Sequence, residues 1–397
     1  IGNGGGGPGM EHMERLKRIK NLAGVCQVKQ ESAENFFERW RKEASRFSKW
    51  IGELYVERHQ GTLTTHGNMK RYNRLAEIAL HDLEFTGILA GKNWPQEKLE
   101  KIWKEILLYQ FHDILPGSSI KRVYQEAYER YEILLKEINE GIAENIQKIA
   151  NTVNTGKMTK PVLVFNSLSW QRKEWLKLGG KWKKVTVPPA GYTTINLAAN
   201  DNLPKISAEK NKLETDMLRI QFDKSGAIAG IYDKRLKREI LAKGEKANRL
   251  AVYCDRGDAW DFPMDYAEQT PEYMNLISCK PYIDGPQAVM RQKYEYKGSI
   301  LTQDIIITSG LARIDFKTSL NWATPNTMLR TIFPVDVRND YATYEIQFGH
   351  LTRTTHNNTS WDMAKHEVVA QKFADISQAD FGVAILNDCK YGHKIKN

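Results

Sequence analysis

Residues 109–119 of the sequence contain its clearest pattern for chemistry. They place a His-Asp pair, His112 and Asp113, at the end of an apolar helical stretch and just before a Pro-Gly turn. A helix end beside a loop suits a metal ligand, because packing can fix the imidazole while one ring nitrogen faces a cleft. On spacing alone, a histidine satisfied by backbone groups is the simpler interpretation. Without an HExxH motif or a second histidine at ligand spacing, this segment cannot build a zinc site by itself.

Two glutamates lie in a second stretch of interest, residues 50–62. Glu53 and Glu57 are placed among aromatic and apolar residues. Such surroundings raise the pKa of a carboxyl group toward the range of a general acid. The alternative is a pair of surface glutamates partnered by Arg58 and its neighbours.

A tryptophan flanked by carboxylates forms the third pattern. Trp260 and Asp261 lie in the segment 257–261, within the half of the chain that we expect to be β structure. An exposed tryptophan can stack on the C–H face of a sugar while the acids bind its hydroxyls. A packed tryptophan with helix- or turn-capping acids explains the same residues equally well.

The elements that must position these residues change type once, near residue 155. Apolar residues at helical spacing predict helices before that point, at Glu11–Ile19, Ala33–Arg46, Lys70–Leu89, from Asn93-Trp94-Pro95 to Phe111, and Ile120–Ala150. Asn154–Lys157 then reads as a linker. Beyond it, short alternating stretches separated by turns predict antiparallel strands. We therefore expect an α+β chain, with a helical bundle followed by an antiparallel β-sandwich.

Composition excludes several classes of protein. With 397 residues, of which 41% are hydrophobic and 27% charged, the chain is neither disordered nor fibrous. The net charge of +10 comes from acidic and basic residues that are interspersed, and no basic stripe alternates with aromatics, so we expect no nucleic-acid partner. There is no apolar run near 18 residues, so we expect no membrane span. The cysteines form no regular pattern, which suits the reducing cytoplasm: Cys26, Cys254, Cys279 and Cys389.

Five segments in order along the chain resemble glycoside hydrolase family 38, in particular the bacterial and cytosolic branch of its α-mannosidases. They are Gly52-Glu53-Leu54-Tyr55 through Gly61-Thr62, Gln110 to Gly117, Asp258 to Asp261, Thr355-His356 through Ser360-Trp361-Asp362, and Leu386 to Gly392. The resemblance implies a zinc-dependent retaining enzyme that hydrolyses terminal α-linked mannose from oligosaccharides. It also implies a (β/α)7 barrel, a three-helix bundle and β-sandwich domains.

The resemblance assigns parts of this chain to parts of such an enzyme. Residues 1–45 would be a remnant of the barrel edge, 46–155 the helical bundle, and 156–397 an incomplete β-sandwich region. Of the family's zinc ligands, only the bundle histidine has a counterpart, His112. The other ligands and the nucleophile would lie in a barrel preceding Ile1, so we expect the isolated chain to be inactive.

Further roles follow from the same resemblance. Glu53 lies near the position of an acidic catalytic residue in other branches, which makes it the candidate general acid and Glu57 the fallback. Asp113, Trp260 and Asp261 would bind substrate. A homo-oligomer is compatible with the sequence, and a non-catalytic carbohydrate-binding module is the alternative function. The chain departs from the family pattern at Gln60, where arginine is usual, and at Thr354 and His366, where proline and phenylalanine are usual.

Overall fold

The computed structural model describes residues 6–91 and 96–396. The chain divides into two compact units, Ile1–Tyr55 and Val56–Asn397. The first unit contains the helices α1 (Met10–Ile19) and α2 (Ala33–Arg41) and the 3-10 turn η1 (Ala44–Arg46), none of which has a buried residue. The helix predicted over 33–46 is therefore shorter than expected. Its last turn tightens where the Lys42 N–H bonds to the Arg39 carbonyl, and α2 ends there.

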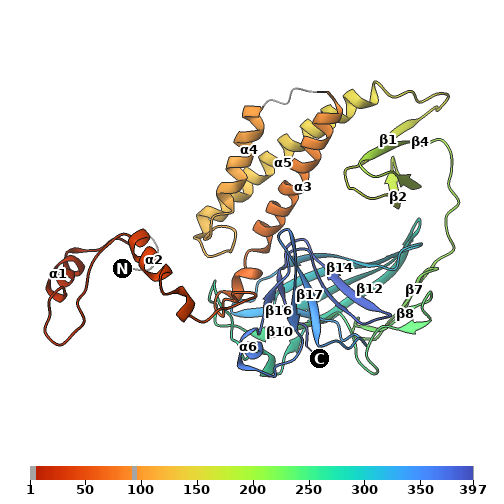
Figure 1. The fold of residues 1–397 in the computed structure, drawn as a ribbon. Helices are drawn as coiled ribbons and strands as arrows, with labels where there is room; N and C mark the ends of the chain where they lie inside the picture. Colours follow the sequence, from red (N-terminus) through yellow and green to blue (C-terminus); the bar gives the residue numbers. More distant parts are fainter. Residues whose placement is uncertain (1–5, 92–95, 397) are drawn as a thin grey trace. The chain divides into compact units, whose positions relative to one another are not determined.

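Three helices form the bundle of the second unit: α3 (Gly67–Leu89), α4 (Gln96–Tyr109) and α5 (Lys121–Ala150). They lie side by side in Figure 1 and share one apolar core. Its fully buried side chains include Met69, Leu80, Ile106, Tyr131 and Ile138, which recur at helical spacing on the three helices. The predicted helix start at Asn93-Trp94-Pro95 lies outside the described residues.

Antiparallel sheets follow the bundle, as the alternating pattern predicts. A five-stranded sheet in the order β5-β6-β7-β8-β9 and a four-stranded sheet in the order β12-β13-β14-β15 enclose a common core. Leu213, Ile220 and Ile228 from the first sheet meet Met290 and Ile305 from the second. This is a sandwich, in which each sheet buries one face. The bounds are β5 Ser207–Glu209, β6 Lys212–Glu214, β7 Leu218–Phe222, β8 Ile228–Asp233, β9 Arg238–Glu239, β12 Asn275–Asp284, β13 Gln287–Tyr296, β14 Ser299–Thr308 and β15 Ile314–Asn321.

Smaller sheets complete the β region. Two two-stranded pairs directly follow the bundle: β1 (Pro161–Asn166) with β4 (Gly191–Asn196), and β2 (Arg172–Leu178) with β3 (Lys181–Val187). A three-stranded sheet has the order β11-β10-β16, with bounds Glu272–Tyr273, Arg249–Cys254 and Thr327–Ile332. A four-stranded sheet has the order β18-β17-β20-β21, with bounds Gly349–Thr354, Tyr341–Ile346, Phe373–Ser377 and Gly382–Leu386. The last pair is β19 (Val368–Val369) with β22 (Gly392–His393).

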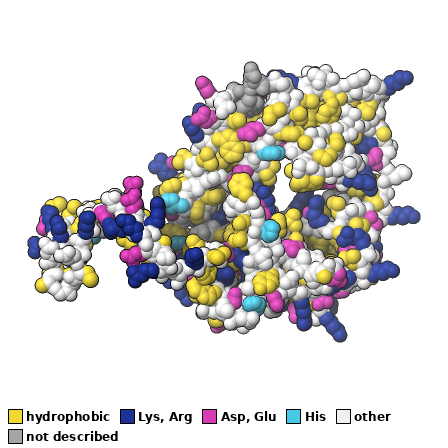
Figure 2. Space-filling model, viewed as in Figure 1, with side chains coloured by type: hydrophobic (Ala, Val, Ile, Leu, Met, Phe, Trp, Pro, Cys, Tyr) yellow, Lys and Arg dark blue, Asp and Glu magenta, His cyan; other side chains and the backbone are white. Residues whose placement is uncertain are grey.

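These elements confirm the predicted α+β architecture. Across the described ranges, no helix is both long and apolar enough to cross a membrane. On the face of the second unit that Figure 2 shows, basic and acidic side chains are interspersed, as they are in the sequence.

Candidate functional site

Residues 59–66, which we call the junction segment, connect the start of the second unit to helix α3. The segment contains the 3-10 turn η2 (Gln60–Leu63) and is bracketed by two histidines in the left-handed region, His59 at φ 70° and His66 at φ 49°. Residues other than glycine rarely adopt this conformation, and they do so where surrounding contacts hold them. Contacts with three other segments of the chain hold the junction segment in this conformation.

The loop that carries His112 lies against one side of the junction segment. His112 follows α4, and its side chain is 78% exposed, with Nε2 3.6 Å from Oδ2 of Asp113. The Phe111 ring lies beside the imidazole, with the ring centroids 4.0 Å apart. Asp113 is held in place because its Oδ1 accepts a hydrogen bond from Ser118 Oγ at 3.0 Å and its carbonyl accepts one from Tyr124 Oη at 3.1 Å. The result is an outward-facing imidazole beside a fixed carboxylate.

Trp260 and Asp261 lie against the same segment from the loop after β10. Asp261 Oδ1 accepts a hydrogen bond from the His59 N–H at 2.6 Å, so this carboxylate supports the left-handed turn. Gly61 lies so close that a Cβ there would be 2.8 Å from the Trp260 carbonyl oxygen. The Trp260 side chain remains 44% exposed. The exposed indole ring is compatible with stacking on a sugar. Asp261, in contrast, already holds the backbone of His59 through its hydrogen bond.

The end of the chain forms the third contact with the junction segment. The Tyr391 N–H donates to the Leu63 carbonyl at 3.1 Å, and Lys390 Nζ donates to the Thr64 carbonyl at 3.2 Å. Arg74 of α3 donates to Tyr391 Oη at 3.3 Å and to the Gln371 carbonyl at 2.9 Å. The His112 loop, the Trp260 loop and the 387–391 segment, all singled out by the sequence, therefore meet at one short stretch of backbone.

The two candidate acids belong to different units. Glu53 lies in the first unit, where its carbonyl accepts a hydrogen bond from Trp50 Nε1 at 2.9 Å. Glu57 lies in the second unit and is exposed. Trp50 and Leu54, two of the apolar residues near Glu53 in the sequence, are themselves exposed. The role of each glutamate stays a prediction.

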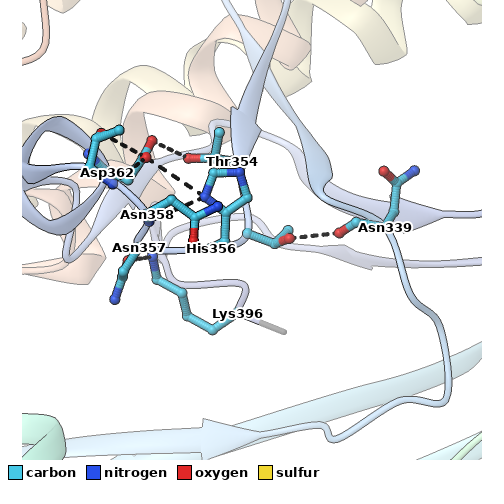
Figure 3. A network of polar contacts seen from close by, with 9 residues as sticks. Asn339, Thr354, His356, Asn357, Asn358, Asp362 and Lys396 are labelled. Carbon is cyan, nitrogen blue, oxygen red and sulfur yellow. Dashed lines mark hydrogen bonds and ion pairs between the residues drawn. The ribbon is translucent and has the colours of Figure 1, made fainter.

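A separate polar network organises residues 354–362 (Figure 3). Asp362 accepts hydrogen bonds from Thr354 Oγ1 and Thr359 Oγ1, both at 2.7 Å, and lies 3.7 Å from His356 Nδ1. These hydrogen bonds, with Thr354 first, hold the pKa of Asp362 below its ordinary value. Thr354, which stands where proline is usual in the family pattern, thus has a defined hydrogen-bond partner, Asp362. Buried His366 packs its ring edge-on against Phe262, with the centroids 5.8 Å apart. The imidazole thus makes an aromatic contact at the position where phenylalanine is usual in the family pattern.

Sequence reasoning missed the most buried charged group of the site. Lys70 in the first turn of α3 is 2% exposed. Burial, with a smaller effect from the charge of Lys390, lowers the pKa of Lys70 to about 7. Lysine is ordinarily a surface residue, so a helical lysine in a sequence gives no sign of such a place. His66 was missed as well; its ring stacks on Tyr124 with the centroids 3.8 Å apart.

Metal binding can be tested against the donors present. Zinc sites in proteins use three or four nitrogen, sulfur or oxygen ligands. Over residues 6–91 and 96–396, no three His, Cys, Asp or Glu side chains gather in a metal-binding arrangement. His112 and Asp113 can contribute one or two ligands, and the exposure of the imidazole leaves it open to a metal held jointly with other groups.

Two family descriptions match the chain. "Alpha mannosidase middle domain" matches residues 57–149, and "Glycosyl hydrolases family 38 C-terminal domain" matches residues 213–397. The first range covers the junction segment, the bundle and the His112 loop. The second covers most of the sandwich, the Trp260 loop and the network of Figure 3.

Curated relatives extend over the whole chain. Alpha-mannosidase G of Dictyostelium discoideum is 33% identical over 99% of this chain, and Alpha-mannosidase 2C1 of Mus musculus is 33% identical over 100%. The matched regions are 42% and 40% of those proteins, so the chain spans about two fifths of their length. Among solved structures, an alpha-mannosidase from Enterococcus faecalis V583 superposes with a TM-score of 0.76 at 13% identity, covering 93% of this chain and 55% of that one. That likeness supports the fold.

Proposed function

Because the chain belongs to glycoside hydrolase family 38, we propose that it supplies the middle and C-terminal parts of a zinc-dependent retaining α-mannosidase. The substrate class would be oligosaccharides that end in α-linked mannose. The observation that carries the proposal is the geometry of the His112 loop, in which the exposed imidazole of His112 lies next to the fixed carboxylate of Asp113. This loop contacts the junction segment, which also contacts the Trp260 loop. We also propose a cytoplasmic location, because the spacing of the four cysteines, among them the exposed Cys26 and Cys254, matches no disulfide framework.

We propose His112 as one ligand of the zinc ion, with Asp113 orienting the site or binding sugar hydroxyls. Bound zinc would act as a Lewis acid and a template for the sugar. The exposed apolar side chains of Leu107, Leu108 and Phe111 lie within five residues of His112. Their exposure is compatible with a metal site that groups from elsewhere in the enzyme complete.

The metal role is tested with His112→Ala in the complete enzyme, by metal analysis and mannoside hydrolysis. His81→Ala is a matched control, because His81 is also exposed, on α3, and also pairs with a following aspartate, at 3.4 Å. We expect His112→Ala to lose stoichiometric zinc and most turnover while the control keeps both. Full zinc content with near-normal turnover in His112→Ala would remove this histidine from the site.

Retaining hydrolysis uses two carboxyl groups about 5–5.5 Å apart, one attacking the anomeric carbon and one protonating the leaving oxygen. We propose Glu53 for the protonating role and Glu57 as the fallback. In the complete enzyme, Glu53→Gln should slow the hydrolysis of mannosides with poor leaving groups and spare activated aryl mannosides, which need little protonation. Glu57→Gln is the parallel variant. An equal loss on both substrate classes in Glu53→Gln would argue against the assignment.

The described residues hold no complete metal site, so we propose that the 397-residue chain alone does not turn over mannosides. Measurable hydrolysis by the purified chain would overturn this.

The exposed ring of Trp260 favours a second function, sugar binding without catalysis. Titration of the chain with mannosides, and with duplex DNA at two salt concentrations, separates the readings. Mannoside binding that Trp260→Ala abolishes would support the binding module, and salt-sensitive DNA affinity would support neither sugar-based function.

A further inference from the structure

Lys70 makes an unusual set of bonds for a lysine in a helix. Its Nζ donates to three backbone carbonyls, those of Thr65 at 2.7 Å, Leu115 at 3.0 Å and Pro116 at 3.2 Å. An ammonium group has three N–H donors and no acceptor, so these carbonyls use its full bonding capacity. No carboxylate takes part in the set. Backbone oxygens therefore accept its hydrogen bonds, in a place from which water is nearly excluded.

The three carbonyls come from two different segments. Thr65 belongs to the junction segment, whereas Leu115 and Pro116 belong to the loop that carries His112 and Asp113. A second contact joins the same two segments: Gly117, at φ 103°, lies so close to Thr65 that a Cβ on it would be 2.7 Å from Thr65 Cγ2. Thr65 in turn donates from Oγ1 to the Gly61 carbonyl at 2.7 Å. The Lys70 bonds are thus part of a compact seam.

We propose that Lys70 is a positioning residue that fixes the His112 loop against the junction segment and so sets where the imidazole and the Asp113 carboxylate point. This inference rests on the proposed function in one respect, that the position of His112 matters because it binds zinc. The anchoring of the loop by Lys70 does not depend on a metal. Within the loop, the backbone bonds are short-range: the N–H groups of Ile114 and Leu115 both donate to the Phe111 carbonyl, at 2.9 and 3.1 Å. Such a turn holds its own shape, and bonds from other elements hold its place: those of Lys70 and the one that Tyr124 Oη of α5 donates to the Asp113 carbonyl.

Removal of the three donors should loosen the loop locally. In Lys70→Met the side chain keeps nearly its length and its apolar stem, while three desolvated carbonyls lose their partner. Lys183→Met is the matched control, because Lys183 is also buried, also donates to a backbone carbonyl, that of Ala199, and lies in β3 away from the seam. Any general effect of removing a buried lysine appears in both variants.

The first measurement is hydrogen–deuterium exchange of the 397-residue chain. We expect the amides of residues 111–117 to exchange at least tenfold faster in Lys70→Met and at the wild-type rate in Lys183→Met. Lys70→Gln, which keeps two N–H donors, gives an intermediate rate and replaces the methionine variant if that one does not fold. Wild-type protection of the loop in Lys70→Met, or equal loss in both methionine variants, overturns the proposal.

The second measurement is zinc affinity of the complete enzyme. Residues that hold a metal ligand in place typically contribute 10- to 100-fold to affinity, and we expect a loss in that range for Lys70→Met and none for Lys183→Met. A loosened loop with unchanged zinc affinity would uphold the anchoring by Lys70 and instead contradict the ligand role of His112. The two measurements therefore separate this inference from the proposed function beneath it.

Discussion

Replacement of Arg330 by methionine should destabilise the second unit strongly, because it removes the guanidinium that pairs with a buried carboxylate. Arg330 of β16 pairs with Glu367 just before β19, with Nη1 3.0 Å from Oε1. The Glu367 side chain is only 2% exposed. Breaking a buried ion pair by removing one partner costs about 3–5 kcal/mol, since the remaining charge stays desolvated. The guanidinium also lies 4.8 Å from the ring centroid of the buried Tyr266, and that contact is lost as well.

The size of the loss should depend on which partner is removed. Arg330 is 19% exposed, so in Glu367→Gln the guanidinium can still reach water and keeps its place over Tyr266. We expect roughly 1–3 kcal/mol for Glu367→Gln, the cost of one charged hydrogen-bond partner. The double variant, which carries neither charge of the pair, should be more stable than Arg330→Met by about 1 kcal/mol or more.

Urea unfolding of the chain and its three variants, followed by circular dichroism, gives the free energies of unfolding. Equal losses in the two single variants would show that burial of the carboxylate does not set the energy. A double variant no more stable than Arg330→Met would show the same. Either result would refute the reasoning, which depends on the difference in exposure of the two side chains.

Three further predictions concern single residues. Gly117→Ala should cost roughly 1–3 kcal/mol in urea unfolding, because its φ of 103° strains any residue with a Cβ and the methyl group would meet Thr65. Tyr131→Phe should stabilise the bundle by up to about 1 kcal/mol, since the buried hydroxyl has no hydrogen-bond partner within residues 6–91 and 96–396; a destabilised variant would contradict this. Burial, reinforced by the charge of Arg330, lowers the pKa of His393 to about 4. The folded chain then binds fewer protons than the unfolded one between pH 4 and 6.5, so stability should fall as the pH drops through this window, by up to about 3 kcal/mol, and His393→Gln should flatten this dependence in urea midpoints.

The helices could be predicted because their signal is local. Apolar residues three and four positions apart identify α3 and α5, and the observed ends of α5 lie within one residue of the predicted Ile120–Ala150. The same signal overextended α2, where Phe36 and Trp40 have core spacing but instead form an aromatic cluster with Phe47 on an exposed helix. Helical spacing of apolar residues shows that one face of a helix is apolar, but it does not show whether another part of the protein covers that face.

The convergence of the site could not be predicted in the same way. The motifs pointed to His112 and Trp260 separately, but His59 and Asp261, which are bonded directly, are 202 residues apart. No local pattern encodes such a pairing. Lys70 and Arg330 were missed for a related reason: each is buried only because segments from distant parts of the sequence cover it, and a charged residue by itself predicts the surface.

The bonds between helix α3 and the last strands have a consequence for how the chain is made. Lys390 closes on Thr64 across 326 residues, whereas the bundle core draws only on helices within the first 150. At a synthesis rate of 5–20 residues per second, the ribosome needs roughly 15–65 s to add the intervening chain. During that interval the nascent bundle lacks the last strands of the chain, so Arg74 and the junction segment have not yet formed their hydrogen bonds with Tyr391. The contacts of the 387–391 segment with the junction segment and Arg74 are thus among the last in the second unit to form during biosynthesis.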